Sequence, residues 1–550
     1  MAPVSFEVQA SYAPLIVVAS HIATVIYSTC VISLGLHQSY TELRPSQDTR
    51  LRITKRKKAT PVFAVLALLS LATAAYHAVN YVVLSYKVWA DERGVVLPNS
   101  LIGATSPVTN GTSAAPLYVR MWLTDTPIYR DALEIVAEKG RRFWWANQRA
   151  LATTSWSMLL AIEGRRRKIP FLVGYLLLAQ LVNLSFAQNL FYLSLLLTPS
   201  PLESSTVSSD SRLSRLLARA FPPKPNNWCP NPALFLGLLM LNYASLALLP
   251  AVAGGQLFPI VTGLTTLFTF GVVILPVIVP ESWGTVHAHP HNAYSAFTSL
   301  FRFISLASTA LHWKASISGV LDNLPRSYEH RHSILMPLGT EERSNWERTT
   351  TAAGRVLGSI SDHPVVAAVG SDVLLSALSI GLWAAVRAID VDSILAASTP
   401  YYKCAASTLS TPTALVTADG ESTAEDEHLN QESEQPTTVR RRGRPRKSRL
   451  PSISTPNDAN DANDANDAVA TSATAPRKRG RPRKVKPNLD EAPGDETYVP
   501  SPSVAGSVIE GDEVLTEDDW EAASLAWGLT ALGGLGAGSA GVFGAECISR

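Results

Sequence analysis

The sequence has little charge and few cysteines, and both scarcities narrow the class of protein. Only 17% of the 550 residues are Asp, Glu, Lys or Arg, whereas about a quarter is usual in soluble proteins. The four cysteines are widely scattered, which excludes a disulfide framework or a closely spaced zinc site. No Lys or Arg precedes the first apolar run, so we interpret that run as a retained anchor and not as a secretory signal peptide.

Signatures of catalysis and of metal binding are also missing. The sequence contains no nucleophile elbow, phosphate loop or paired-carboxylate arrangement, so an enzyme is the least favoured class. Three histidines alternate between His287 and His291, but no carboxylate or thiol nearby completes a set of metal ligands. We therefore expect no metal and no cofactor.

Long apolar stretches are what the sequence does contain. A helix needs about 20 apolar residues to cross the hydrocarbon core, and lipid offers no partner to free backbone groups. We predict an all-α fold, a bundle of eight or nine membrane-spanning helices that places the chain in a lipid bilayer. The predicted spans are 13–36, 61–86, 143–162, 170–197, 232–249, 257–279, 293–313, 365–386 and 522–545.

Composition divides the chain into three parts. Residues 1–390 hold the first eight stretches, and residues 522–550 form a glycine-rich C-terminal helix in which Gly534 and Gly538 have GxxxG spacing. Between them, residues 391–521 are rich in Ser, Thr, Pro, Asp and Glu. This middle part has too few large apolar residues to offset its chain entropy, so we expect it to be disordered.

Two short basic segments stand out in the middle part. "RRRGRPRK" begins at Arg440 and "RKRGRPRK" begins at Arg477. Over residues 440–449 and 477–486 they resemble the AT-hook motif of high-mobility-group A chromatin proteins. The resemblance implies binding of A·T-rich double-stranded DNA through Arg442, Gly443, Arg444, Pro445, Arg446, Lys447, Arg479, Gly480, Arg481, Pro482, Arg483 and Lys484.

The residue types of these segments suit a minor groove. Proline fixes φ and makes the preceding arginine extended, while glycine lets the backbone approach the groove floor. The arginines can then lie along a narrow A·T groove, which the guanine amino group would obstruct. The 29 residues of 448–476 span roughly 30 Å as a flexible chain, close to one DNA turn of about 34 Å. Alternatively, the segments bind a nuclear-import receptor or anionic lipids.

Charge near the predicted spans sets the orientation. Seven Lys and Arg lie in 42–59, and "GRRRK" begins at Gly164, so we expect both loops to be cytosolic. The N-terminus and the loop with Asn110, in the glycosylation sequon "NGT", are then outside. Eight crossings would also put the basic segments outside, away from DNA. Either one stretch does not span, with 293–313 the weakest, or these segments bind something else; we favour the cytosolic or nucleoplasmic side.

Polar residues inside the predicted spans are the other candidates for function, because ionisable groups in a membrane are costly. We predict an ion pair between Arg302 and Asp372; alternatively, both reach the headgroup level. His77 and Asn80 share one helix face, and Gln180, Asn183 and Gln188 share another. Such faces join helices by hydrogen bonds more often than they line a pathway.

Two functions follow from these patterns. The first is a membrane tether, anchored in the endoplasmic reticulum or nuclear envelope with the plasma membrane as an alternative, that holds A·T-rich DNA. The second is a transporter or sensor of unknown substrate, in which the polar intramembrane residues matter. The stretches "LVNLSFAQNLF" from Leu181 and "WGTVHAHPHNAY" from Trp283 are similar to a group of uncharacterised multi-pass membrane proteins, which implies a fold and not an activity.

Overall fold

The computed structural model describes helices and short strands from one of the two units of the chain. The described residues are 11–41, 50–95, 97, 117–198, 224, 228–286, 291–331, 339–387, 389–400, 402 and 520–548. All of them belong to the unit made of Met1–Leu409 and Pro500–Arg550, whereas Ser410–Val499 forms a second unit. The two basic segments and Asn110 lie outside the described residues.

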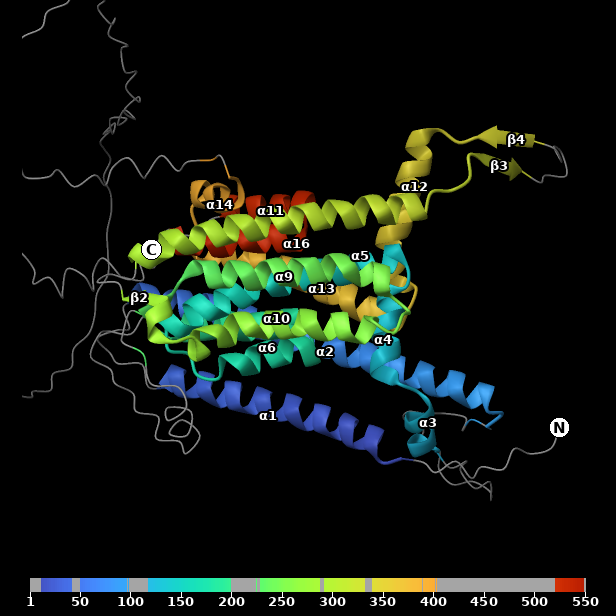
Figure 1. Ribbon diagram of the computed structural model, residues 1–550, viewed down its shortest axis with the longest axis horizontal. Helices are drawn as coiled ribbons and strands as arrows, with labels where there is room; N and C mark the ends of the chain where they lie inside the picture. The colour runs from blue at the N-terminus through green and yellow to red at the C-terminus, as the bar shows by residue number, and fades with distance from the viewer. Residues whose placement is uncertain are drawn as a thin grey trace, which may run out of the picture. The chain divides into compact units, whose positions relative to one another are not determined.

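Each predicted apolar stretch is mostly helical where it is described, and the long helices pack side by side (Figure 1). The π-turn Leu160–Gly164 continues α5. Seven helices run from one end of the bundle to the other: α1 (Ala13–Thr41), α2 (Arg50–Glu92), α5 (Gly140–Leu159), α9 (Pro232–Val252), α10 (Phe258–Ile278), α11 (His291–Asp322) and α13 (Pro364–Arg387).

Shorter elements mark the two ends of the bundle. One end, the α3 end, carries α3 (Val119–Asp125), α4 (Ile128–Ala137) and α12 (Asn345–Gly358). The other, the α14 end, carries α14 (Val391–Ser398) and the antiparallel strands β1 (Trp228–Pro230) and β2 (Gly284–Val286). A second antiparallel pair, β3 (Tyr328–Arg331) and β4 (Gly339–Glu342), follows α11. Apart from these ribbons, the described residues form an all-α fold.

The stretch 170–197 does not form the single helix that the sequence predicts. It is a hairpin of α6 (Leu172–Leu181) and α7 (Leu184–Leu197), here called hairpin A. The hydroxyls of Tyr175 and Ser194 form a hydrogen bond, and the rings of Tyr175 and Phe191 lie 5.5 Å apart. The hairpin therefore starts and finishes at the α14 end, and the turn between its two arms lies within the bundle.

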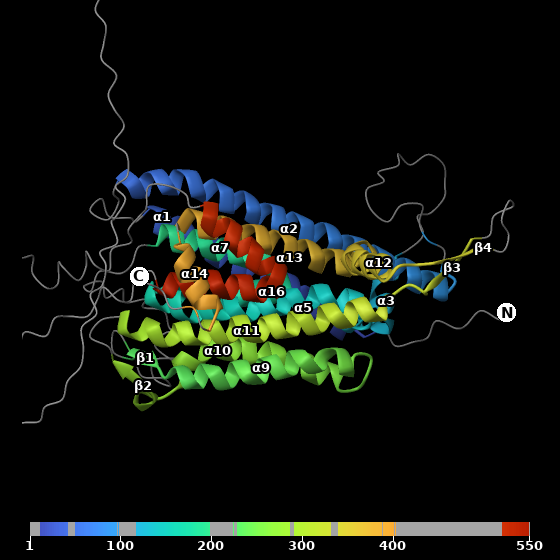
Figure 2. The same ribbon diagram turned by 90° about the horizontal axis from the view of Figure 1, so that it is seen from above.

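The C-terminal helix α16 (Trp520–Ile548) is also folded back, and it is here called hairpin B. Its backbone leaves helical geometry at Gly534, where φ is 82°. A Cβ at Gly541 would lie 3.3 Å from Leu529, although residues twelve apart in a straight helix are about 18 Å apart. The two arms thus lie against each other (Figure 2). Gly538, from the GxxxG pair, packs against Thr530 of its own hairpin.

Large apolar side chains are exposed on the surface of the bundle, and many polar side chains are buried inside it. By length and composition, six described helices are apolar enough to cross a membrane: Ala13–Thr41, Lys58–Glu92, Pro232–Val252, Phe258–Ile278, Pro364–Arg387 and Trp520–Cys547. Leu34, Leu68 and Leu267 are more than 60% exposed on outer helix faces, as suits a lipid solvent. Inside, Trp383 stacks on Tyr192 at 4.4 Å, beside many buried polar residues.

Candidate functional site

A polar run in the middle of α5 connects the two hairpins. Asn147 and Gln148 are buried, and the neighbouring Arg149 is half-buried. The amide of Asn147 donates to the carbonyl oxygen of Leu311 at 3.4 Å. Polar side chains at this depth require protein partners, because lipid supplies none. The partners of Gln148 and Arg149 are the turns of hairpins B and A.

The turn of hairpin A is held by a pair of opposite charges. Asp372 of α13 accepts hydrogen bonds from the backbone N–H groups of Leu184 (2.9 Å) and Ser185 (2.7 Å), in the first turn of α7. Arg149 lies 3.2 Å from the same carboxylate and donates to the carbonyl oxygen of Ala179, in the last turn of α6, at 2.6 Å. An anion at a helix N-terminus and a cation at a C-terminus each complement the helix dipole.

The predicted ion pair between Arg302 and Asp372 is wrong. Arg302 donates to the carbonyl oxygen of Ala396 in α14, and Asp372 pairs with Arg149. The two residues lie at different depths along their helices, too far apart to form a pair. From the α3 end, Arg302 lies 20 residues into α11 and Asp372 lies eight residues into α13, a difference of roughly 18 Å at 1.5 Å per residue. Helix α11 is longer than the stretch 293–313, so the sequence placed Arg302 at the wrong level.

The turn of hairpin B is held by a neutral side chain. The Gln148 carbonyl oxygen accepts a hydrogen bond from the backbone N–H of Leu535 at 3.0 Å, and the Gln148 amide donates to Nδ1 of His312 at 2.7 Å. A Cβ at Gly534 would lie 2.7 Å from that carbonyl oxygen and 2.9 Å from the His312 ring. Glycine is required here twice, for the positive φ and for the close approach.

A cavity of about 300 Å³ lies beside the turn of hairpin A. Among the described residues that form its wall, Arg149 alone is charged, and a quarter of the arginine side chain is exposed. Apolar side chains make up most of the remaining wall. The other polar side chains are amides and hydroxyls, namely Asn147, Thr153, Gln180, Thr262, Thr265, Thr266 and Thr269.

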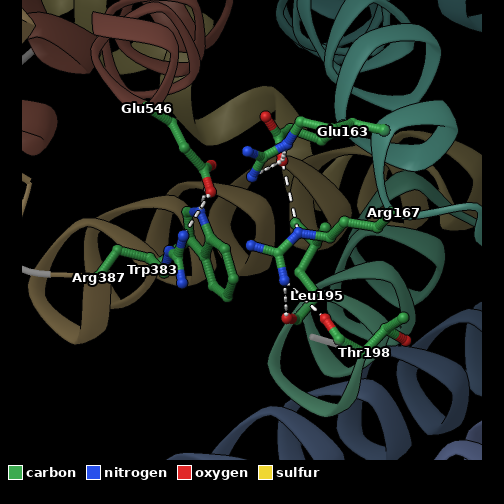
Figure 3. A network of polar contacts seen from close by, with 8 residues as sticks. Glu163, Arg167, Leu195, Thr198, Trp383, Arg387 and Glu546 are labelled. Carbon is green, nitrogen blue, oxygen red and sulfur yellow. Dashed lines mark hydrogen bonds and ion pairs between the residues drawn. The ribbon is translucent and has the colours of Figure 1, made fainter. Parts of the chain in front are cut away.

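The open end of hairpin A rests on a second set of buried charges. Arg167 donates to the carbonyl oxygens of Leu195 (2.9 Å) and Thr198 (2.6 Å), where α7 ends (Figure 3). Its guanidinium lies 3.5 Å from Glu163, which is fully buried in the π-turn after α5. Such single-turn π elements often occur at functional sites.

Hairpin B finishes in the same network. Near its end, Glu546 lies 3.2 Å from Arg387 and accepts a hydrogen bond from the indole N–H of Trp383 at 3.2 Å (Figure 3). Glu546 is 1% exposed, and buried carboxylates of this kind require a charged partner. Charges therefore hold the open ends of both hairpins, whereas only hairpin A has a charged turn. The sequence analysis missed Glu163, Glu546 and Gln148; a carboxylate or amide within or beside an apolar stretch was the available signal.

The remaining predicted residues fall into three groups. Asn183 joins helices, since its amide donates to the carbonyl oxygen of Ser70 in α2 at 2.9 Å, whereas Gln188 bonds within α7 to Tyr192 at 2.7 Å. Gln180 lines the cavity. His77 and Asn80 are half-buried on α2. The twelve AT-hook residues and Asn110 lie outside the described residues. No cluster of His, Cys, Asp or Glu suited to a metal ion occurs within the described ranges.

Comparison with known proteins gives no match: no family model, no curated protein and no solved structure is significantly similar to this chain.

Proposed function

We propose that this chain is a multi-pass membrane protein of the transporter or sensor type that receives a small polar solute at the turns of its hairpins. One observation carries the proposal: two helices fold back inside the bundle, and their turns bind the adjacent residues Gln148 and Arg149 of α5. Irregular backbone at membrane depth is stable only inside protein or beside a water-filled cavity. Half-helix ends at that depth are typical solute sites of transporters.

The cavity beside Arg149 leaves a quarter of this side chain exposed, which a purely structural turn would not need. Its wall is mostly apolar with a few polar side chains, the usual composition of a small-molecule site. The turns of the hairpins are held by Asp372, Arg149, Gln148 and the Asn183 cap of α7, and the side chain of Gln180 is not among these partners. Among the described residues the side-chain amide of Gln180 makes no hydrogen bond, and a solute or water in the cavity would satisfy it.

Cysteine labelling from the aqueous side tests this function. In a chain without its native cysteines, a cysteine at the cavity residue Gln180 should react with a membrane-impermeant charged thiol reagent. A matched cysteine at Leu68, which is 66% exposed on the outer face of α2, should stay unreactive because lipid covers it. Equal protection of both positions would overturn the proposal.

A tether for A·T-rich DNA remains the second candidate. The hairpins favour it because they change the side of the bundle on which we expect the AT-hook segments. Among the described residues, seven helices run from end to end and both hairpins return to the α14 end, which gives an odd number of end-to-end passages before residue 402. With the basic loops cytosolic, this count supports a cytosolic or nucleoplasmic side for the AT-hook segments. In this arrangement the stretch 170–197, and not the weak stretch 293–313, is the one that does not run from end to end. The endoplasmic reticulum or nuclear envelope suits such a tether better than the plasma membrane.

Binding and sidedness test the tether together. A peptide of residues 430–490 should bind an A·T duplex more tightly than a G·C duplex, and R444A with R481A should remove the preference. Equal binding to both duplexes would leave general polycation behaviour, as expected of a nuclear-import or anionic-lipid signal. In sealed microsomes, protease should cleave the 403–519 segment without detergent. Protection of that segment would overturn the tether.

A further inference from the structure

We propose that the solute bound beside hairpin A is a small amphipathic monocarboxylate, and this inference deepens the proposed function and rests on it. The chemistry of the cavity wall carries the argument. A wall with one cation, no exposed anion and a mostly apolar surface is complementary to a molecule with one negative group and an apolar body.

The cation is Arg149, and most of its hydrogen-bonding capacity is unused. A guanidinium has five N–H donors in a planar fork, and among the described residues only the Ala179 carbonyl oxygen accepts a hydrogen bond from it. A quarter of the side chain is exposed, and it lines the cavity. A carboxylate can therefore approach this fork from the cavity and accept the charge-assisted bonds that guanidinium groups form.

Asp372 does not cancel this attraction, because its charge is spread over other partners. The carboxylate is 2% exposed, does not line the cavity, and accepts two backbone N–H groups from the start of α7. The positive end of that helix dipole, equivalent to about half a charge, shares in neutralising it. A solute in the cavity therefore meets the arginine and not the aspartate.

The wall opposite Arg149 determines which apolar part of a solute the cavity can hold. Thr262, Thr265, Thr266 and Thr269 lie along α10, and each hydroxyl donates to the carbonyl oxygen four residues earlier, at 2.8 to 3.0 Å. Their donors are used, so they offer the cavity only acceptor lone pairs and methyl groups. Phe143, Leu246 and Leu249 complete an apolar surface. A volume of about 300 Å³ lies at the small end of ligand cavities, roughly 300–1,000 Å³, and matches a small solute.

A second carboxylate or a positive charge is disfavoured by the same wall. A cation would face Arg149 at close range with no aspartate or glutamate in the cavity wall to compensate. A dianion would leave one charge against apolar side chains, which is costly in a low-dielectric environment. The isosteric amide of the same acid fits the space but lacks the charge, so it makes the best matched control ligand.

Binding of radiolabelled benzoate to the full chain in nanodiscs of neutral phospholipid tests the inference. We expect saturable binding, at least tenfold weaker competition by benzamide, and no competition by cyclohexylamine. Ala146→Phe, which places a ring in the cavity and keeps the charge of Arg149, should weaken benzoate binding at least tenfold. Ala75→Phe, on an exposed face of α2, should leave it unchanged.

The outcomes separate the solute class from the proposed function. Competition by benzamide equal to that of benzoate, or stronger competition by cyclohexylamine, would overturn the monocarboxylate. Equal benzoate binding by the Ala146→Phe and wild-type chains would also overturn it, because the cavity would not be the site. If a cysteine at Gln180 reacts from water while benzoate does not bind, the solute path stands and the class is wrong. If neither result is obtained, both proposals fail.

Discussion

Hairpins A and B have the same architecture but different chemistry at their turns. The turn of hairpin A is held by Asp372 and Arg149, a pair of opposite charges 3.2 Å apart. The turn of hairpin B is held by Gln148, an uncharged amide, and by the glycine at position 534. Each solution satisfies the free backbone groups that a broken helix leaves inside a bundle.

These two kinds of contact indicate which hairpin can move. Separating Arg149 from Asp372 leaves a bare charge in a low-dielectric interior, at a cost of about 3–5 kcal/mol for a buried pair. Breaking the neutral bond from Leu535 to Gln148 costs only about 1–3 kcal/mol for an unsatisfied polar group. We therefore expect hairpin A to be the fixed wall of the site and hairpin B to be the element that yields first.

Removing the aspartate of hairpin A should have the largest effect. Asp372→Ala uncovers two backbone N–H groups and leaves Arg149 without its partner, so we expect about 3–5 kcal/mol of destabilisation. Thermal unfolding of the purified protein in detergent measures it. Replacing both members, with Arg149→Met and Asp372→Leu, should restore part of the loss because no lone charge remains. A double variant less stable than Asp372→Ala would contradict the idea that the lone charge dominates.

Substitution of the glycine in hairpin B should have an intermediate effect. Gly534→Ala places a Cβ 2.7 Å from the Gln148 oxygen at a φ of 82°, which we expect to cost about 1–3 kcal/mol. Gly528, in the first arm of the same hairpin, has nothing within 4 Å of its Cβ position. Gly528→Ala should stabilise by about 0.5–1 kcal/mol, because alanine favours a helix. Equal thermal midpoints for the two variants would show that the turn at position 534 is not needed.

Some of this comparison could be read from the sequence, and some could not. The all-α fold follows from the apolar stretches, because composition and length determine where a helix can lie in lipid. The turns do not follow, since the arms of a hairpin are as apolar as a span. In hairpin A, the signal was Asn183, a preferred N-cap residue, in the middle of the stretch 170–197. In hairpin B, Gly534 was visible only as part of a packing motif.

The candidate site was less predictable than the fold, for a reason of geometry. Asp372 and Gln180 were identified as important polar residues, but their partners lie on segments far apart in the sequence. Pairing Asp372 with Arg302 assumed that neighbouring stretches have equal lengths. The fold overrides that assumption by placing the turn of hairpin A between α5 and α13. Depth along a helix is encoded in tertiary packing, which the pattern of apolar residues does not report.

The smallest effect is expected from the N-cap of α7, and it tests whether hairpin A depends on charge alone. Asn183 accepts a hydrogen bond from the backbone N–H of Phe186 at 3.1 Å. Asn183→Ala removes this cap and the hydrogen bond from the Asn183 amide to Ser70, so it should destabilise the protein by about 1–2 kcal/mol. Asn183→Ser keeps a capping oxygen and should cost less. Asn231, which caps α9 and accepts from Ala233 at 3.0 Å, is the matched control outside the hairpins.

The losses of stability of Asn183→Ala and Asn231→Ala, compared with each other, show whether hairpin A depends on charge alone. If Asn183→Ala costs no more than Asn231→Ala in thermal unfolding, the cap of α7 is an ordinary helix cap, and the charge pair alone holds the turn. A loss approaching that of Asp372→Ala would mean that the cap and the charges act as one unit. Hairpin A would then be held by a cooperative network, and the contrast with hairpin B would lie in the number of hydrogen bonds as well as in charge.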